Sequence, residues 1–148
     1  MAELQARISE DTKVAMKARD KARVATLRMV NAEIKRVEVD ERRELSDEDV
    51  LGILNRMLKQ RRDSLTQFEQ AERMDLADQE RFEITVIESF MPEALSESEI
   101  DALIERVVSD TGASTMRDMG QVMGIIKSEV TGRADMGVVS GKVKARLS

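Results

Sequence analysis

Apolar residues recur every three or four positions along most of this chain, and polar residues fill the intervals. In the first 40 residues a broad seam comprises Leu27, Val30, Ile34 and Val37. This spacing places apolar side chains on one face of an α-helix. A narrower seam of mostly small residues, suited to close packing, comprises Ala15, Ala18, Ala22, Ala25, Met29 and Ala32. The pattern predicts an all-α protein.

Capping residues divide the N-terminal pattern into separate helices. Asp20 can end one helix and begin the next. Ser46 is followed three residues later by Asp49, a capping-box pattern that predicts a long helix starting near Asp47. The seam of that helix comprises Leu51, Leu54, Leu58, Arg61, Leu65 and Phe68.

Pro92 marks the predicted boundary between two parts of the chain. A short turn at residues 72–78 (ERMDLAD) precedes a helix through Phe82, Val86 and Phe90, which Pro92 stops. Beyond it, a second capping box at Ser96 begins a helix that Gly112 ends. Two tail helices follow, joined by the sequence TGRAD, with apolar residues at Met119, Met123, Ile126 and Val130 and at Val139, Val143 and Leu147. We therefore predict a long-helix N-terminal domain, residues 1–92, and a small three-helix C-terminal domain, residues 93–148.

Glycine interrupts both tail helices at regular intervals. Gly120 and Gly124 are four residues apart, as are Gly137 and Gly141, and each glycine within a helix costs roughly 1 kcal/mol relative to alanine. We interpret all four as close-packing glycines that let the two helices approach each other. The alternative is an open surface that a sugar–phosphate backbone approaches. A phosphate-binding loop is excluded, because no strand precedes these glycines and no Lys-Ser or Lys-Thr pair directly follows the last one.

Charge is unevenly distributed along the 148 residues. The net charge of −5 argues against indiscriminate binding of polyanions. Residues 114–148, however, hold six basic and three acidic residues, so this segment is +3 and the rest of the chain is −8. The candidate RNA-binding residues of this segment are Lys127, Arg133, Lys142 and Lys144.

A second basic group lies in the long N-terminal helix, in the sequence NRMLKQRRDS. Arg61 falls on the apolar seam, where a guanidinium must reach solvent or pair with a carboxylate. We expect a structural ion pair with Asp63, Glu69 or an acid nearer the N-terminus. Lys59 and Arg62 then remain as further RNA-binding candidates.

The chain has no cysteine and no histidine, which removes the commonest metal ligands, the thiol nucleophile and the commonest general base. Its 29 carboxylates make chance Asp/Glu pairs unavoidable. We predict no catalytic residue, no metal site and no cofactor. Three Phe and no Tyr or Trp leave no platform for stacking unpaired bases, so an RNA ligand would be read through its shape and phosphates.

Targeting signals are not evident in the sequence. No stretch approaches the roughly 18 apolar residues that span a membrane. The N-terminal residues lack the apolar centre of a secretory signal. We predict a cytoplasmic protein.

Several motifs resemble those of a known family, and they cover nearly the whole chain. They are TLRM at 26–29, KQRRDS at 59–64, FMPEALSESE at 90–99, DMGQVMG at 118–124, GRAD at 132–135, and VSGKVKARL from residue 139. On these motifs the chain resembles the YqeY family, which is related to the C-terminal tail domain of the B subunit (GatB) of the glutamine-dependent aspartyl/glutamyl-tRNA amidotransferase.

The resemblance implies a long-helix domain followed by a small three-helix domain. It also implies a tail that packs against transfer RNA, while the chemistry of the amidotransferase occurs on parts that this chain lacks. The family label is carbon–nitrogen ligase activity with glutamine as amide donor, a label inherited from the multidomain relative.

Two functions follow as hypotheses. The first is a stand-alone, non-catalytic, tRNA-associated module resembling the amidotransferase tail, with a partner in the tRNA amidation or translation machinery. The alternative is a protein–protein adaptor that docks through its acidic N-terminal helices.

Overall fold

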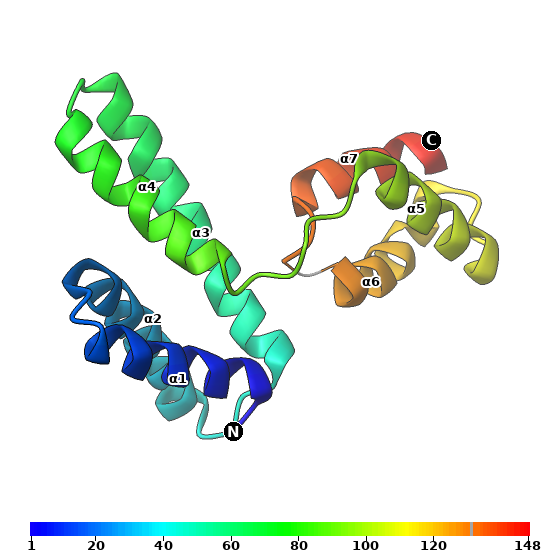
Figure 1. Cartoon of the computed structure of the whole chain (residues 1–148). Coiled ribbons are helices and arrows are strands. Elements are labelled where there is room, and N and C mark those ends of the chain that lie inside the picture. Colours follow the sequence, from blue (N-terminus) through cyan, green and yellow to red (C-terminus); the bar gives the residue numbers. More distant parts are fainter. Residues whose placement is uncertain (131) are drawn as a thin grey trace. The chain divides into compact units, whose positions relative to one another are not determined.

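The computed structural model describes residues 1–130 and 132–148 (Figure 1). Within these residues the prediction of an all-α protein is confirmed, with seven α-helices, one short 3₁₀ helix and no strand. The elements are α1 (Glu3–Lys17), α2 (Lys21–Glu41), α3 (Asp47–Gln70), α4 (Met74–Glu88), α5 (Glu97–Thr111), η1 (Met116–Asp118), α6 (Met119–Val130) and α7 (Met136–Leu147).

Contacts group the chain into two compact units. Unit 1 comprises Met1–Met91 and contains α1 to α4, and unit 2 comprises Pro92–Ser148 and contains the remaining helices. The boundary differs by one residue from the predicted domains at 1–92 and 93–148. The division into two domains stays a prediction.

The helix starts of unit 1 follow the capping residues in the sequence. The Asp20 carboxylate accepts a hydrogen bond from the Arg23 amide (3.2 Å), so the predicted division between α1 and α2 is confirmed. Ser46 and Asp49 form the predicted capping box at the start of α3. Asp47 has a second role, because its Oδ1 accepts from the Leu4 amide (2.9 Å) and thereby caps α1, whose own N-cap residue offers no side-chain acceptor.

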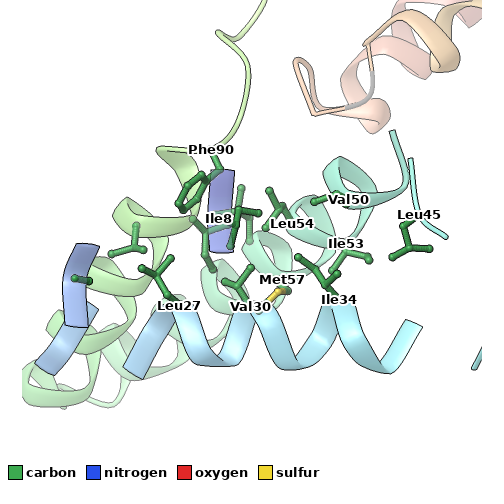
Figure 2. Packing of buried hydrophobic residues seen from close by; sticks show 14 residues of the cluster. Ile8, Leu27, Val30, Ile34, Leu45, Val50, Ile53, Leu54, Met57 and Phe90 are labelled. Atoms are coloured by element: carbon green, nitrogen blue, oxygen red, sulfur yellow. The ribbon is translucent and has the colours of Figure 1, made fainter. Parts of the chain in front are cut away.

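The core of unit 1 forms where α1 and α2 pack on α3 and α4. Figure 2 shows the buried side chains that converge from these helices and from the loops beside them: Ile8, Leu27, Val30, Ile34, Leu45, Val50, Ile53, Leu54, Met57 and Phe90. The broad seam predicted in α2 therefore faces the core. The narrow seam does not, since Ala15 is its only buried member and Met29 remains 38% exposed. Small size permits close packing but contributes little apolar area to drive it.

Two predicted boundaries of α4 need correction. The turn before it is limited to residues 71–73, with Glu72 in the left-handed region at φ 58°, and the helix already begins at Met74. Asp75 lies in its first turn, where a negative charge favours the helix start. At the other end α4 stops at Glu88, so Phe90 lies beyond the helix and fills the core from a turn.

Unit 2 is a three-helix bundle whose last two helices have similar sequences and bury the same positions. The sequences of α6 (MGQVMGIIKSEV) and α7 (MGVVSGKVKARL) are identical at five of twelve positions. The three buried residues occupy the same positions in both helices: Val122, Ile126 and Val130 in α6, and Val139, Val143 and Leu147 in α7. Ser96 caps α5 as predicted, and Gly112 ends it in the left-handed conformation at φ 69°. The outward faces of α6 and α7 therefore also correspond.

Candidate functional site: the outer face of helices α6 and α7

The four glycines of α6 and α7 lie on exposed surface. A Cβ added at Gly120, Gly124 or Gly141 would meet no atom within 4 Å, and one added at Gly137 would meet only the Oδ1 of the capping Asp135, at 3.1 Å. The interpretation of these residues as close-packing glycines is therefore wrong within the described chain. The larger apolar side chains four positions apart on the opposite face of each helix form the core instead, because they bury more apolar area.

Ion pairs with α5 mark one edge of each helix. On α7, Lys142 Nζ lies 3.1 Å from Glu97 Oε1 and 2.8 Å from Asp101 Oδ1, and Arg146 Nε lies 2.6 Å from Glu105 Oε1. On α6, Glu129 pairs with Arg106 of α5. The pairs with Asp101 and Glu97 raise the pKa of Lys142, and the pair with Glu105 raises that of Arg146.

The equivalent lysines Lys127 and Lys144 lie on the opposite edge. Each is two positions from a residue that pairs with α5, Glu129 in α6 and Arg146 in α7, which is about 200° of rotation on a helix. Both are exposed. We call the surface made by Gly120, Gly124, Lys127, Gly137, Gly141 and Lys144 the α6–α7 outer face. It carries a repeated pattern of two glycines and a lysine.

Two other cations predicted for unit 2, Lys142 and Arg133, bind groups of the same unit. Lys142 is held between two carboxylates of α5, with its side chain 25% exposed. Arg133 donates from Nε to the Glu93 carbonyl oxygen (3.0 Å). The positive segment also packs on an acidic helix: residues 92–113 hold six acidic residues and one basic residue, so unit 2 as a whole is −2. A polyanion is therefore better accommodated on the edge away from α5 than on unit 2 in general.

The basic group of α3 belongs to unit 1 and is used differently. Arg62 pairs with Glu88 of α4 (2.9 Å), while Lys59 is exposed. Arg61 forms the expected structural ion pair, but with Glu83 of α4 (Nε to Oε2, 3.3 Å) rather than with any of the acids suggested from the sequence. Both side chains are largely buried, at 14% and 10% exposure. Glu83 was missed because only the packing of α4 on α3 brings the two together.

Away from the predicted site residues, residues 1–130 and 132–148 carry a groove but no metal-binding cluster. A groove of about 610 Å³ lies between α1 and α2, lined by Gln5, Asn31, Lys35, Glu38 and neighbouring residues, and it contains none of the predicted site residues. In the described residues no group of three or more Asp or Glu is arranged to hold a metal ion. None of the described helices is both long and apolar enough to cross a membrane.

Comparison with known families decides the relationship that the motifs suggested. The family model described as Yqey-like protein matches residues 5–147, which include all seven α-helices except the first two residues of α1. The chain belongs to the YqeY family. Its match extends through both units.

Relatives of this YqeY-family chain occur in fungi. It is 32% identical over 144 residues to a Kluyveromyces lactis protein named altered inheritance of mitochondria protein 41, mitochondrial, covering 95% of this chain and 74% of the relative. A protein of the same name from Pyrenophora tritici-repentis is 29% identical over 141 residues, covering 93% of this chain and 77% of the relative. Another protein of that name, from Lachancea thermotolerans, is 32% identical over 108 residues, covering 71% of this chain and 58% of the relative.

These relatives overturn the prediction of a cytoplasmic location, because their names describe them as mitochondrial. The prediction rested on the lack of a long apolar segment. That observation concerns secretion and membrane insertion, whereas segments that direct import into mitochondria are amphipathic and rich in arginine.

Proposed function

We propose that this YqeY-family protein is a non-catalytic RNA-binding module whose α6–α7 outer face contacts the sugar–phosphate backbone of transfer RNA. The proposal keeps the likeness to the amidotransferase tail. It assigns the ligase label to the multidomain relative rather than to this chain, and it places the working partner in the tRNA amidation or translation machinery.

The observation that carries the proposal is the open space over the glycines. Helical glycines cost stability, and neither α6 nor α7 uses them for packing within the described residues of unit 2. A surface without Cβ atoms lets a large, rigid partner approach the helices closely. Lys127 and Lys144 flank that surface, and ammonium groups at such an edge suit phosphate oxygens, which supply most protein–nucleic acid hydrogen bonds.

The experiment is a titration of the purified protein with unfractionated tRNA at several salt concentrations. Phosphate contacts predict that the logarithm of the affinity falls with the logarithm of salt, with a slope of roughly 0.7 to 0.9 for each phosphate neutralised. We expect Lys144→Ala to reduce the slope by about one such contact, and Gly124→Leu to weaken binding without unfolding the protein.

Lys13→Ala is the matched control. Lys13 is exposed on α1 in the other unit, and its removal changes the net charge by the same amount. Equal loss of affinity in the two lysine variants would mean that only overall charge matters. Absence of tRNA binding at low salt would end the proposal.

A second candidate is the protein adaptor, which one observation favours. Unit 1 exposes large apolar side chains, including Val14 at 56% and Val39 at 61%, together with an excess of three negative charges over residues 1–91. Purification of tagged protein from cells with and without nuclease separates the candidates. A partner protein that survives nuclease supports the adaptor, while loss of all partners after nuclease supports RNA binding.

A further inference from the structure

The chain passes from unit 1 to unit 2 through a short segment that is held at both ends. On the unit 1 side, Phe90 is buried, and the Arg7 guanidinium carbon lies 5.1 Å from the centre of the Phe90 ring. The Met91 amide donates to the Glu88 carbonyl oxygen (3.0 Å). On the unit 2 side, Leu95 packs against the core of that unit. Only residues 92–94 lie between these two anchors.

Arg133 holds this segment at two positions. Its carbonyl oxygen accepts from the Leu95 amide (2.8 Å), and its guanidinium Nε donates to the Glu93 carbonyl oxygen (3.0 Å). The Arg133 amide in turn donates to the Val130 carbonyl oxygen (2.8 Å), which fixes the residue at the end of α6. The Glu93 and Ala94 side chains are exposed, so apolar packing does not hold them. The guanidinium bond is the only hydrogen bond found for residues 92–94 in the described part of the chain.

We propose that this hydrogen bond, which we call the Arg133 clamp, sets the length of the free segment between the two units. We also propose that the clamp opens when a phosphate group binds the Arg133 guanidinium in place of the Glu93 carbonyl oxygen. With the clamp closed, only Pro92 lies between Met91, the last held residue of unit 1, and Glu93, the first held residue of unit 2. With the clamp open, residues 92–94 are free while Leu95 stays anchored. The role of the clamp in shortening the free segment does not depend on the proposed function, whereas its opening by phosphate rests on that function.

The competing bonds have unequal strength. The clamp joins a guanidinium to a neutral carbonyl oxygen, but a phosphate accepts two parallel hydrogen bonds from the same group. Both interactions use the charged guanidinium as donor and are therefore charge-assisted, but the phosphate adds a second hydrogen bond and an opposite charge, and arginine suits this paired geometry. Glu99 is the nearby competitor: its pKa is lowered first by hydrogen bonds from Ser96 and further by the charge of Arg133. The hydrogen bond from the Ser96 amide to Glu99 Oε1 (3.2 Å) keeps this carboxylate at the start of α5.

Cleavage of the full chain by a glutamate-specific endoprotease measures the clamp directly, because the Glu93–Ala94 bond lies in the released segment. We expect Arg133→Ala to raise the cleavage rate after Glu93 about fivefold, the population change that loss of one such hydrogen bond produces. Arg133→Lys should give a smaller rise, since a single ammonium lacks a donor fixed at the Nε position.

Arg117→Ala is the matched control, because it removes one exposed guanidinium from the same unit and should leave cleavage after Glu93 unchanged. Cleavage after Glu105, within α5, reports unfolding of unit 2 as a whole. The clamp would be overturned if the cleavage rate after Glu93 in Arg133→Ala stayed within twofold of that of the unaltered chain. It would also be overturned if cleavage after Glu105 rose by the same factor.

The same assay with added tRNA, and separately with inorganic polyphosphate, tests opening. We expect each anion to raise cleavage after Glu93 in the unaltered chain and to have no further effect in Arg133→Ala. Unchanged or slower cleavage while tRNA is bound would overturn opening by phosphate but leave RNA binding intact. If tRNA does not bind, the proposed function fails, and the comparison of Arg133→Ala with the unaltered chain still decides the clamp.

Discussion

Replacing the glycines of α6 by alanine should make unit 2 more stable. Gly120 and Gly124 lie in a helix, and a Cβ at either position would project into open space. The folded state therefore gains no clash, while the unfolded chain loses backbone freedom. The expected gain is about 1 kcal/mol for each substitution and about 2 kcal/mol for the pair.

Two other glycines serve as internal controls. Gly112 has φ 69°, a conformation that strains any residue with a Cβ, so Gly112→Ala should reduce the free energy of unfolding by about 1 kcal/mol. Gly137→Ala should give a smaller gain than Gly124→Ala, because its Cβ would lie 3.1 Å from Asp135 Oδ1 and that cap must shift.

Urea denaturation followed by far-ultraviolet circular dichroism measures these changes, since the chain has no Trp or Tyr for fluorescence. A loss of stability in Gly120→Ala or Gly124→Ala would refute the reasoning, and it would show that another surface packs against these glycines. A gain in stability together with weaker tRNA binding is the combination expected of glycines kept for a ligand.

Three further predictions concern charged groups of unit 1 and are measured by the same denaturation experiments. Glu83→Ala should lower the free energy of unfolding by about 2–3 kcal/mol, because it leaves the Arg61 guanidinium largely buried without its carboxylate; a loss under 0.5 kcal/mol would contradict this. Burial, and secondarily the charge of Glu83, raises the pKa of Glu80, so the folded state binds its proton more tightly and loses stability as pH rises through that range. Glu80→Gln should therefore stabilise the protein at neutral pH but not at acidic pH, and an effect independent of pH would refute the assignment. Hydrogen bonds from Arg43, then from Ser46, hold the pKa of Asp49 well below its usual range. The contribution of Asp49 to the free energy of unfolding is present at neutral pH and is lost as pH falls below about 4. Asp49→Asn should therefore make the free energy of unfolding depend less on pH in the acid range.

Local chemistry in the sequence predicted most of the helix boundaries. Asp20, Ser46, Ser96 and Gly112 act on amides or carbonyls within a few residues, so their effect does not depend on the rest of the fold. The α4 boundaries were less accurate because no comparable cap marks its start, and a proline two or more residues past a helix does not fix where the helix ends.

The candidate site could be predicted only in part. Its residues were named from glycine spacing and clustered charge, but spacing alone does not tell whether a strip of small residues faces a neighbour or solvent. The outcome depended on which face of each helix buried more apolar area. Likewise, Lys142 and Lys144 are equivalent by charge, and only the packing of α5 engages one and leaves the other exposed.

The amino-acid sequence by itself determined the helical class, the caps and the family, because these depend on periodicity, near-neighbour hydrogen bonds and motifs spread along the whole chain. Tertiary structure decided the partners of distant charges: Arg61 with Glu83, Lys142 with the acids of α5, and Arg133 with the Glu93 carbonyl. Each of these bonds spans more than 20 residues of sequence, and its energy exists only after packing has brought the elements together.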